Sequence, residues 1–221
     1  MGVIFNLLVT CQKKMNTKLL RQKILDLAIR GKLVPQDPND EPASILLEKI
    51  KAEKERLIKE KKIKPSKKKS VDKSHYGNLF EIPSSWVWVN GFDVFQSMTN
   101  KKPTRGTFTY IDINAIDNSK NRIVNPKVLD AIQAPSRASR EVRSGDTLFS
   151  MVRPYLMNIA YVDSKYDNSI ASTGFFVCRP YKLLLQKYIF YLMLSPYVVY
   201  GLNSYMKGDN SPSINNDDIL N

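Results

Sequence analysis

Residues 145–180, GDTLFSMVRPYLMNIAYVDSKYDNSIASTGFFVCRP, decide the expected fold of this chain. The stretch holds three runs that are rich in β-branched or aromatic residues, at 147–152, 159–162 and 174–178. Each run is bounded by Gly, Pro, Asn, Asp or Ser, a pattern that is typical of strands. We therefore expect a β-sheet at the centre of the C-terminal part of the chain.

Polar side chains lie between and beside these predicted strands: Arg153, Tyr155, Asn158, Ser172, Thr173 and Arg179. A half-buried sheet can present such groups to a ligand from its loops. Arg and Asn are suited to contacting base edges, because they bond in a bidentate way to guanine and adenine. The alternative is that Arg153 and Asn158 only satisfy turns. Both interpretations remain open at the level of sequence.

The charge of the chain is its unusual property. Lys and Arg number 34 and Asp and Glu 21, which gives a formal net charge of +13. Such an excess indicates partners rather than fold, with nucleic acid the first candidate and an anionic membrane surface the second. The excess is concentrated in residues 48–73 and 95–160, whereas residues 161–221 are balanced.

Other classes of function find little support in the sequence. Cys11, Cys178 and His75 are the only cysteines and histidine, so we expect neither a disulfide framework nor a metal site, and a reducing cytoplasm fits. The apolar run at residues 3–9 is too short for a membrane span. No GxGxxG or GxxxxGK(S/T) cofactor motif is present, and no cofactor is expected. Acid pairs such as Asp112 with Asp117 are weak candidates for a nuclease site.

The rest of the chain predicts an α+β protein. Helices are expected from Asn16 or Thr17 to Arg30 and over residues 43–62, followed by a lysine-rich linker. Residues 83–89 resemble a strand with Trp86 and Trp88 in the core, and another strand is expected at 107–113. Two helices follow at 183–194 and 197–206, with core positions that include Leu185.

Basic loops alternate with the predicted strands. Their members are the candidate phosphate contacts Lys101, Lys102, Arg105, Arg122, Arg137 and Arg140. A solvated basic surface explains each residue singly but explains their clustering less well. A turn-rich segment near the C-terminus adds two further candidates, Lys207 and Asn210. Together with the polar residues of 153–173, these form the candidate DNA-contacting set.

Two parts of the chain resemble the specificity (S) subunits of type I restriction–modification systems. Residues 18–60, above all KLVPQDPNDEPAS, are similar to the helical conserved region of that family. IPSSWVWV, GDTLFSMVRPYLMNIAYV, ASTGFFVCRP and MKGDNSPSINNDDIL are similar to a target recognition domain. The expected organisation is an N-terminal extension (1–15), a helical conserved region (16–62), a basic linker (63–75) and a recognition domain (76–221) with a mixed, partly barrel-like sheet.

The resemblance implies a function and a set of partners. Each recognition domain in that family contacts half of a bipartite double-stranded DNA site, and long helices dock methyltransferase (M) subunits, which restriction (R) subunits then join. The S subunit itself has no active site, so the resemblance implies a protein that is not an enzyme. Because only one recognition domain is found, a half-subunit, a shortened form or a recombining cassette is expected, and it would act by pairing with a second half. The rival hypothesis is a protein-interaction or scaffold module that makes no DNA contact of its own; a free-standing nuclease or methyltransferase is a third.

Overall fold

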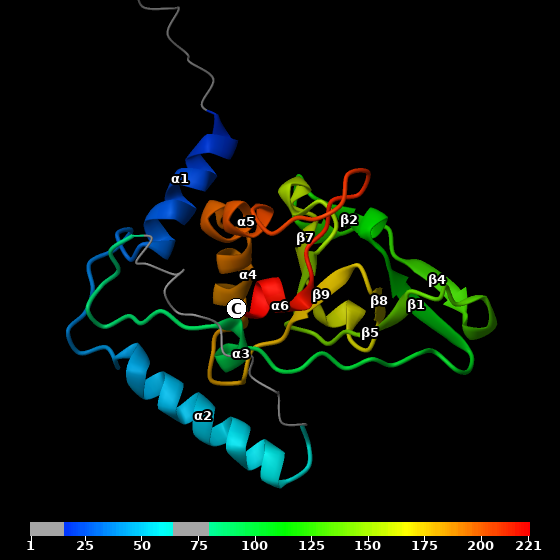
Figure 1. Ribbon diagram of the computed structural model, residues 1–221, viewed down its shortest axis with the longest axis horizontal. Coiled ribbons are helices and arrows are strands. Elements are labelled where there is room, and N and C mark those ends of the chain that lie inside the picture. The colour runs from blue at the N-terminus through cyan, green and yellow to red at the C-terminus, as the bar shows by residue number, and fades with distance from the viewer. Residues whose placement is uncertain (1–15, 64–79) are drawn as a thin grey trace, which may run out of the picture.

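The computed structural model describes residues 16–63 and 80–221 (Figure 1). The predicted N-terminal extension and nearly all of the predicted linker, with Cys11 and His75, lie outside the described residues. In chain order the elements are α1 (Thr17–Ile29), α2 (Ala43–Lys59), α3 (Gly91–Val94), β1 (Thr107–Ile111), η2 (Ile113–Ala115), β2 (Ile116–Asp117), β3 (Arg122–Ile123), β4 (Lys127–Asp130), η3 (Ala131–Gln133), β5 (Ala138–Glu141), β6 (Thr147–Ser150), η4 (Pro154–Leu156), β7 (Ile159–Tyr161), η5 (Ser164–Tyr166), β8 (Ile170–Ser172), β9 (Phe175–Cys178), α4 (Gln186–Met193), α5 (Pro196–Asn203) and α6 (Asn216–Leu220).

The helix α1 begins where its capping residue indicates. The side chain of Asn16 accepts a hydrogen bond from the Leu19 amide at 3.1 Å, which satisfies one free donor at the start of α1. Gly31, at φ 66°, follows the end of this helix, and a Cβ there would lie 2.4 Å from Cγ of Pro83. Along α2, only Ile50 is fully buried, so this helix docks by one narrow edge.

The predicted strand at 83–89 is wrong. The backbone turns at its start, where the Trp86 amide donates to the Pro83 carbonyl at 2.9 Å, and no strand lies beside it. Trp88 is 42% exposed and packs edge-on against Phe80 and in a tilted contact against Tyr197 instead of entering the core. Aromatic and β-branched composition favours a strand only where a neighbour can pair with it.

The three strands predicted from residues 145–180 are confirmed as β6, β7 and β9. They form an antiparallel sheet in the order β7-β6-β9, in which Leu148 lies opposite Val177 and Phe149 opposite Phe176. A second sheet has the order β4-β1-β8-β5 and is mixed, because β1 and β8 run parallel. The strands β2 and β3 form a separate small ribbon. The expected partly barrel-like closure is not found in the described residues; the sheets stay open and separate.

The three-stranded sheet is buried on both faces, which explains why every residue of β6 is buried. Leu148 and Val177 pack with Ile111 of the four-stranded sheet, whereas Phe149 and Phe176 pack with the helical side. Figure 1 shows α4 and α5 on one side of this sheet and β1, β4, β5 and β8 on the other. The outcome is the expected α+β architecture, arranged as helices, sheet and sheet.

The C-terminal helices cover the sheet with one face each. Ile189 and Met193 of α4 and Val199 of α5 are buried in the core beside β6 and β9. The helical conformation is interrupted at Ser195, whose side chain caps α5 by accepting from the Val198 amide at 3.3 Å. Leu185 was predicted to be a core residue, but it precedes α4 and is 70% exposed.

Candidate nucleic-acid interface

A tight turn follows β6 and carries several of the predicted contact residues. In this Arg153 turn (residues 153–158), the backbones of Arg153 and Met157 are left-handed, at φ 48° and 54°. Pro154 is buried and anchors the turn, whereas Tyr155 and Leu156 are 44% and 42% exposed. Left-handed backbone is costly for residues other than glycine, and such residues cluster at functional sites. The turn is therefore a candidate contact element on its geometry as well as on its sequence.

The C-terminal loop (residues 207–213) packs directly on the Arg153 turn. The backbone amide of Arg153 donates to the Pro212 carbonyl, and its guanidinium donates to the Asn210 carbonyl, both at 2.8 Å. Lys207 pairs with Ser213 across the base of the loop, so its shape is fixed by backbone bonds. The structure thus brings Arg153 together with Lys207 and Asn210, which follow it by more than 50 residues.

A third loop, residues 117–122 between β2 and β3, completes this three-loop cluster. The side-chain amide of Asn118 donates to the Leu156 carbonyl at 2.9 Å, and that of Asn121 donates to the carbonyls of Met157 and Ile159 at 3.2 Å. These bonds place Arg122, one residue after Asn121, beside the Arg153 turn. Sequence reasoning missed both asparagines. The available signal was the run of turn-forming residues in IDNSKN, which is compatible with any exposed loop.

Four of the other predicted residues, Lys101, Lys102, Arg137 and Arg140, lie in or beside β5 and form a basic edge, and Arg105 lies before β1 at the β1–β4 end of the same sheet. The amide of Lys101 donates to the Ser139 carbonyl of β5 at 2.7 Å, and the Thr173 amide donates to the Arg137 carbonyl at 2.9 Å. Arg105 lies two residues before β1, next to a turn in which the Gly106 carbonyl accepts from the Ala131 amide. This edge adjoins the three-loop cluster. The amide of Met151, two residues before the Arg153 turn, donates to the carbonyl of Gly174, which follows Thr173.

Several members of the predicted set are less accessible than the sequence suggested. Ser172 is 4% exposed and its hydroxyl accepts from the Gly174 amide, so this side chain holds a turn. Arg140 is partly buried, and its guanidinium donates to the Asn100 side chain at 2.9 Å. Burial lowers the pKa of the Arg140 guanidinium, because no carboxylate among the described residues pairs with it. Asn158 is half-buried within the Arg153 turn.

Ion pairing separates the surface cations of this region into two kinds. Three of them are neutralised locally: Lys120 by Asp117, Lys127 by Asp112 and Arg143 by Glu141. In contrast, Lys101, Lys102, Arg105, Arg122 and Arg137 are exposed and form no ion pair within residues 16–63 and 80–221. Five of the six cations predicted to contact phosphate are therefore available to an external anion, and Arg140 is the exception.

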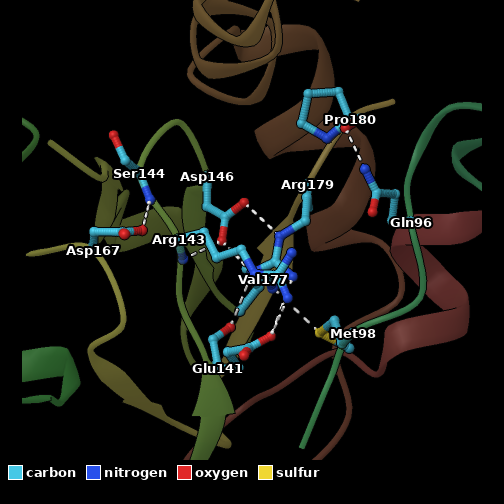
Figure 2. Close-up of polar contacts among 10 residues, drawn as sticks. All are labelled: Gln96, Met98, Glu141, Arg143, Ser144, Asp146, Asp167, Val177, Arg179 and Pro180. Atoms are coloured by element: carbon cyan, nitrogen blue, oxygen red, sulfur yellow. Dashed lines mark hydrogen bonds and ion pairs between the residues drawn. The ribbon is translucent and has the colours of Figure 1, made fainter. Parts of the chain in front are cut away.

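Arg179, which the sequence offered as a loop side chain, has a structural role (Figure 2). Its guanidinium donates to both carboxylate oxygens of Asp146, at 2.9 and 2.7 Å, and lies 3.6 Å from Glu141. Burial alone would lower the pKa of Arg179, but the hydrogen bonds from this guanidinium to Asp146 raise it, so the residue stays charged. Burial raises the pKa of the Asp146 carboxyl, and the same hydrogen bonds oppose that shift. This network ties β5 to the three-stranded sheet.

Two further properties of the described residues bear on the class of protein. Among residues 16–63 and 80–221, no cluster of three His, Cys, Asp or Glu side chains could hold a metal ion. None of the helices in those ranges combines the length and the apolar character needed to cross a lipid bilayer.

Comparison with known proteins identifies relatives of this chain. It is 56% identical over 72 residues to the type I restriction enzyme EcoEI specificity subunit of Escherichia coli, which covers 33% of this chain and 12% of that protein. The EcoAI specificity subunit of the same organism is 56% identical over 71 residues. The HindI specificity subunit of Haemophilus influenzae is 25% identical over 113 residues, or 51% of this chain and 25% of that protein.

The chain is a relative of type I restriction enzyme specificity subunits. The fold agrees: the HsdS subunit from Thermoanaerobacter tengcongensis superposes with a TM-score of 0.60 and 36% identity, over 65% of this chain and 38% of that one. A chain from a structure of type I restriction–modification complex assembly and conformational transition gives a TM-score of 0.61 at 36% identity. No family model matches the sequence. The chain spans 12% of the length of the EcoEI and EcoAI subunits that it matches.

Proposed function

We propose that this chain binds double-stranded DNA sequence-specifically, as the recognition part of a type I restriction–modification specificity subunit. It contacts one half of a bipartite site and directs methyltransferase and restriction subunits to that site. Residues 76–221 are the proposed recognition domain and residues 16–62 the proposed helical conserved region. Chemistry on DNA belongs to the partner subunits in this proposal, and the chain itself is not an enzyme.

The convergence of three sequence-distant loops beside unpaired cations is the observation that carries the proposal. Hydrogen bonds from Asn118, Asn121 and Arg153 join loops that lie 36 to 57 residues apart. The exposed polar groups Arg153, Tyr155 and Asn210 lie in the cluster, and the basic edge adjoins it. Unpaired cations suit phosphate contacts that position the protein, and rigid polar loops suit base contacts that specify the sequence.

An exposed apolar face on α1 supports a protein partner in addition to DNA. Leu20 and Ile24, which lie one turn apart on the same side of this helix, are 42% and 44% exposed, and the adjacent Leu19 is 61% exposed. An apolar stripe of this kind normally packs against another element. We propose that α1 contacts a methyltransferase subunit or a second half-subunit. The scaffold hypothesis assigns the whole chain to such contacts and predicts no intrinsic affinity for DNA.

A salt series on the full chain tests DNA binding. Fluorescence anisotropy with a labelled random-sequence duplex gives the logarithm of the association constant against the logarithm of salt concentration. The magnitude of this negative slope decreases by about 0.9 for each phosphate contact that is lost. The triple variant Lys101→Ala, Lys102→Ala, Arg105→Ala is therefore expected to flatten the slope by about 2.7 units.

The control is the matched triple variant Lys49→Ala, Lys127→Ala, Arg143→Ala. It removes the same charge, but from cations outside the three-loop cluster that already have carboxylate partners. We expect its salt slope to stay within about one unit of the wild type, because these cations contact no phosphate. Equal losses in the two triple variants would mean that only net charge matters, and no binding by the wild type would favour the scaffold hypothesis.

A further inference from the structure

The tip of the Arg153 turn exposes the apolar side chain of Leu156, although buried residues lie on both sides of it in the sequence. Pro154 is buried, and Ile159, where the core begins again, is 1% exposed. Between them Leu156 is 42% exposed, next to Tyr155 at 44%. A singly exposed leucine is common on protein surfaces, so exposure alone carries no function. The backbone that holds Leu156 is what distinguishes it.

That backbone is fixed on both sides of the tip. Arg153 and Met157 adopt left-handed conformations, and Asn121, which binds the turn, has a φ of 53° as well. The carbonyl of Leu156 itself accepts from the Asn118 side chain at 2.9 Å. Strained backbone persists only where surrounding bonds over-determine it. Leu156 is therefore held out on a rigid support and not on a mobile loop.

The surroundings of the tip are cationic. Arg122, Arg153 and Lys207 are exposed and have no carboxylate partner among the described residues, although Asp209 lies in the same C-terminal loop. A partner that fits this surface offers dense negative charge around an apolar interior. A DNA duplex has both, because its phosphates enclose a stack of bases.

We propose that Leu156 is a wedge that inserts between two base pairs of the bound duplex, with Tyr155 packed against the opened step. The inference rests on the proposed DNA-binding function and adds to it a way of deforming DNA. Apolar wedges such as leucine partly unstack a base step and kink the duplex. The energy of that deformation depends on the step, so Leu156 contributes to sequence preference without a hydrogen bond to any base.

The test uses the full chain and the duplex that it enriches from a random pool, with 2-aminopurine placed at successive adenines. Unstacking raises 2-aminopurine fluorescence, so the wild type is expected to raise it at one step and not at its neighbours. Leu156→Ala is expected to abolish that rise and to weaken binding about tenfold, a change of one decade in the dissociation constant. Leu156→Met, which keeps a long apolar side chain, is expected to retain most of the rise.

Val128→Ala is the matched control. Val128 is 72% exposed on the edge strand β4, outside the three-loop cluster, so its loss is expected to change neither fluorescence nor affinity. Equal fluorescence with the wild type and Leu156→Ala would overturn the wedge, as would a Leu156→Ala chain that binds DNA normally but no longer binds a methyltransferase subunit. A wild type that binds DNA without unstacking refutes the wedge alone. A wild type that binds no duplex refutes the proposed function as well.

Discussion

Replacing Arg179 with methionine leaves the Asp146 carboxylate buried without a cation. Asp146 is 2% exposed and receives two hydrogen bonds from Arg179, at 2.9 and 2.7 Å. Removing one partner of a buried ion pair costs about 3–5 kcal/mol, because the remaining charge stays uncompensated. We expect Arg179→Met to lower the free energy of unfolding by that amount. For a chain of this size, the melting temperature falls by roughly 6–20 °C.

Chemical denaturation monitored by circular dichroism measures this loss, and Arg143 supplies the control. Arg143 binds Glu141 at 3.1 Å, but its side chain is 56% exposed, so Arg143→Met is expected to cost about 0–1 kcal/mol. The double variant Arg179→Met, Asp146→Asn removes both charges and is expected to lose less stability than Arg179→Met alone. If Arg179→Met were no more destabilising than Arg143→Met, the network of Figure 2 would not hold the two sheets together.

Three further predictions follow from single positions. Arg153→Ala is expected to cost about 1–3 kcal/mol of discrimination at one base pair, measured with single-substitution duplexes; intact affinity and preference would refute a base contact. Cys178 is fully buried, so in a Cys11→Ser chain its thiol is expected to react with a thiol reagent only on unfolding. Burial also raises the pKa of the Cys178 thiol well above its ordinary value, so at high pH the thiol of the unfolded chain ionises first. The free energy of unfolding is therefore expected to fall as the pH rises past the ordinary thiol pKa, relative to the same chain with Cys178→Ala. In Gly31→Ala the new Cβ would lie 2.4 Å from Cγ of Pro83, whereas Gly106, at a similar φ, faces open space. Gly31→Ala is therefore expected to lower the melting temperature more than Gly106→Ala does, and equal melting temperatures would contradict this.

The strands of the central sheet could be predicted because their signal is local. Each run is apolar, β-branched or aromatic and ends at a turn residue, and the resulting strands are buried whatever they pair with. Residues 83–89 have the same composition but no neighbouring strand, and there the prediction is wrong. Composition reports the tendency to form a strand, and the presence of a partner decides the outcome.

The candidate site shows more clearly what local sequence omits. Arg153 and Arg179 both precede a proline, yet the first is exposed and the second is partly buried in an ion pair with the buried Asp146. The difference arises from strand register: Thr147 pairs with Cys178, which brings Asp146 beside Arg179. Likewise, Asn118 and Asn121 bind carbonyls 36 to 38 residues away, and nothing within their own loop indicates those partners.

Selection from a random duplex pool tests the central claim most directly. The full chain is incubated with the pool at moderate salt, and bound duplexes are recovered and sequenced over several rounds. We predict enrichment of one short motif, the half-site, with weaker enrichment by Arg153→Ala and an unchanged motif for Lys127→Ala. Bound duplexes whose composition matched the input pool, or no bound duplex at all, would contradict the claim that this chain selects the DNA sequence.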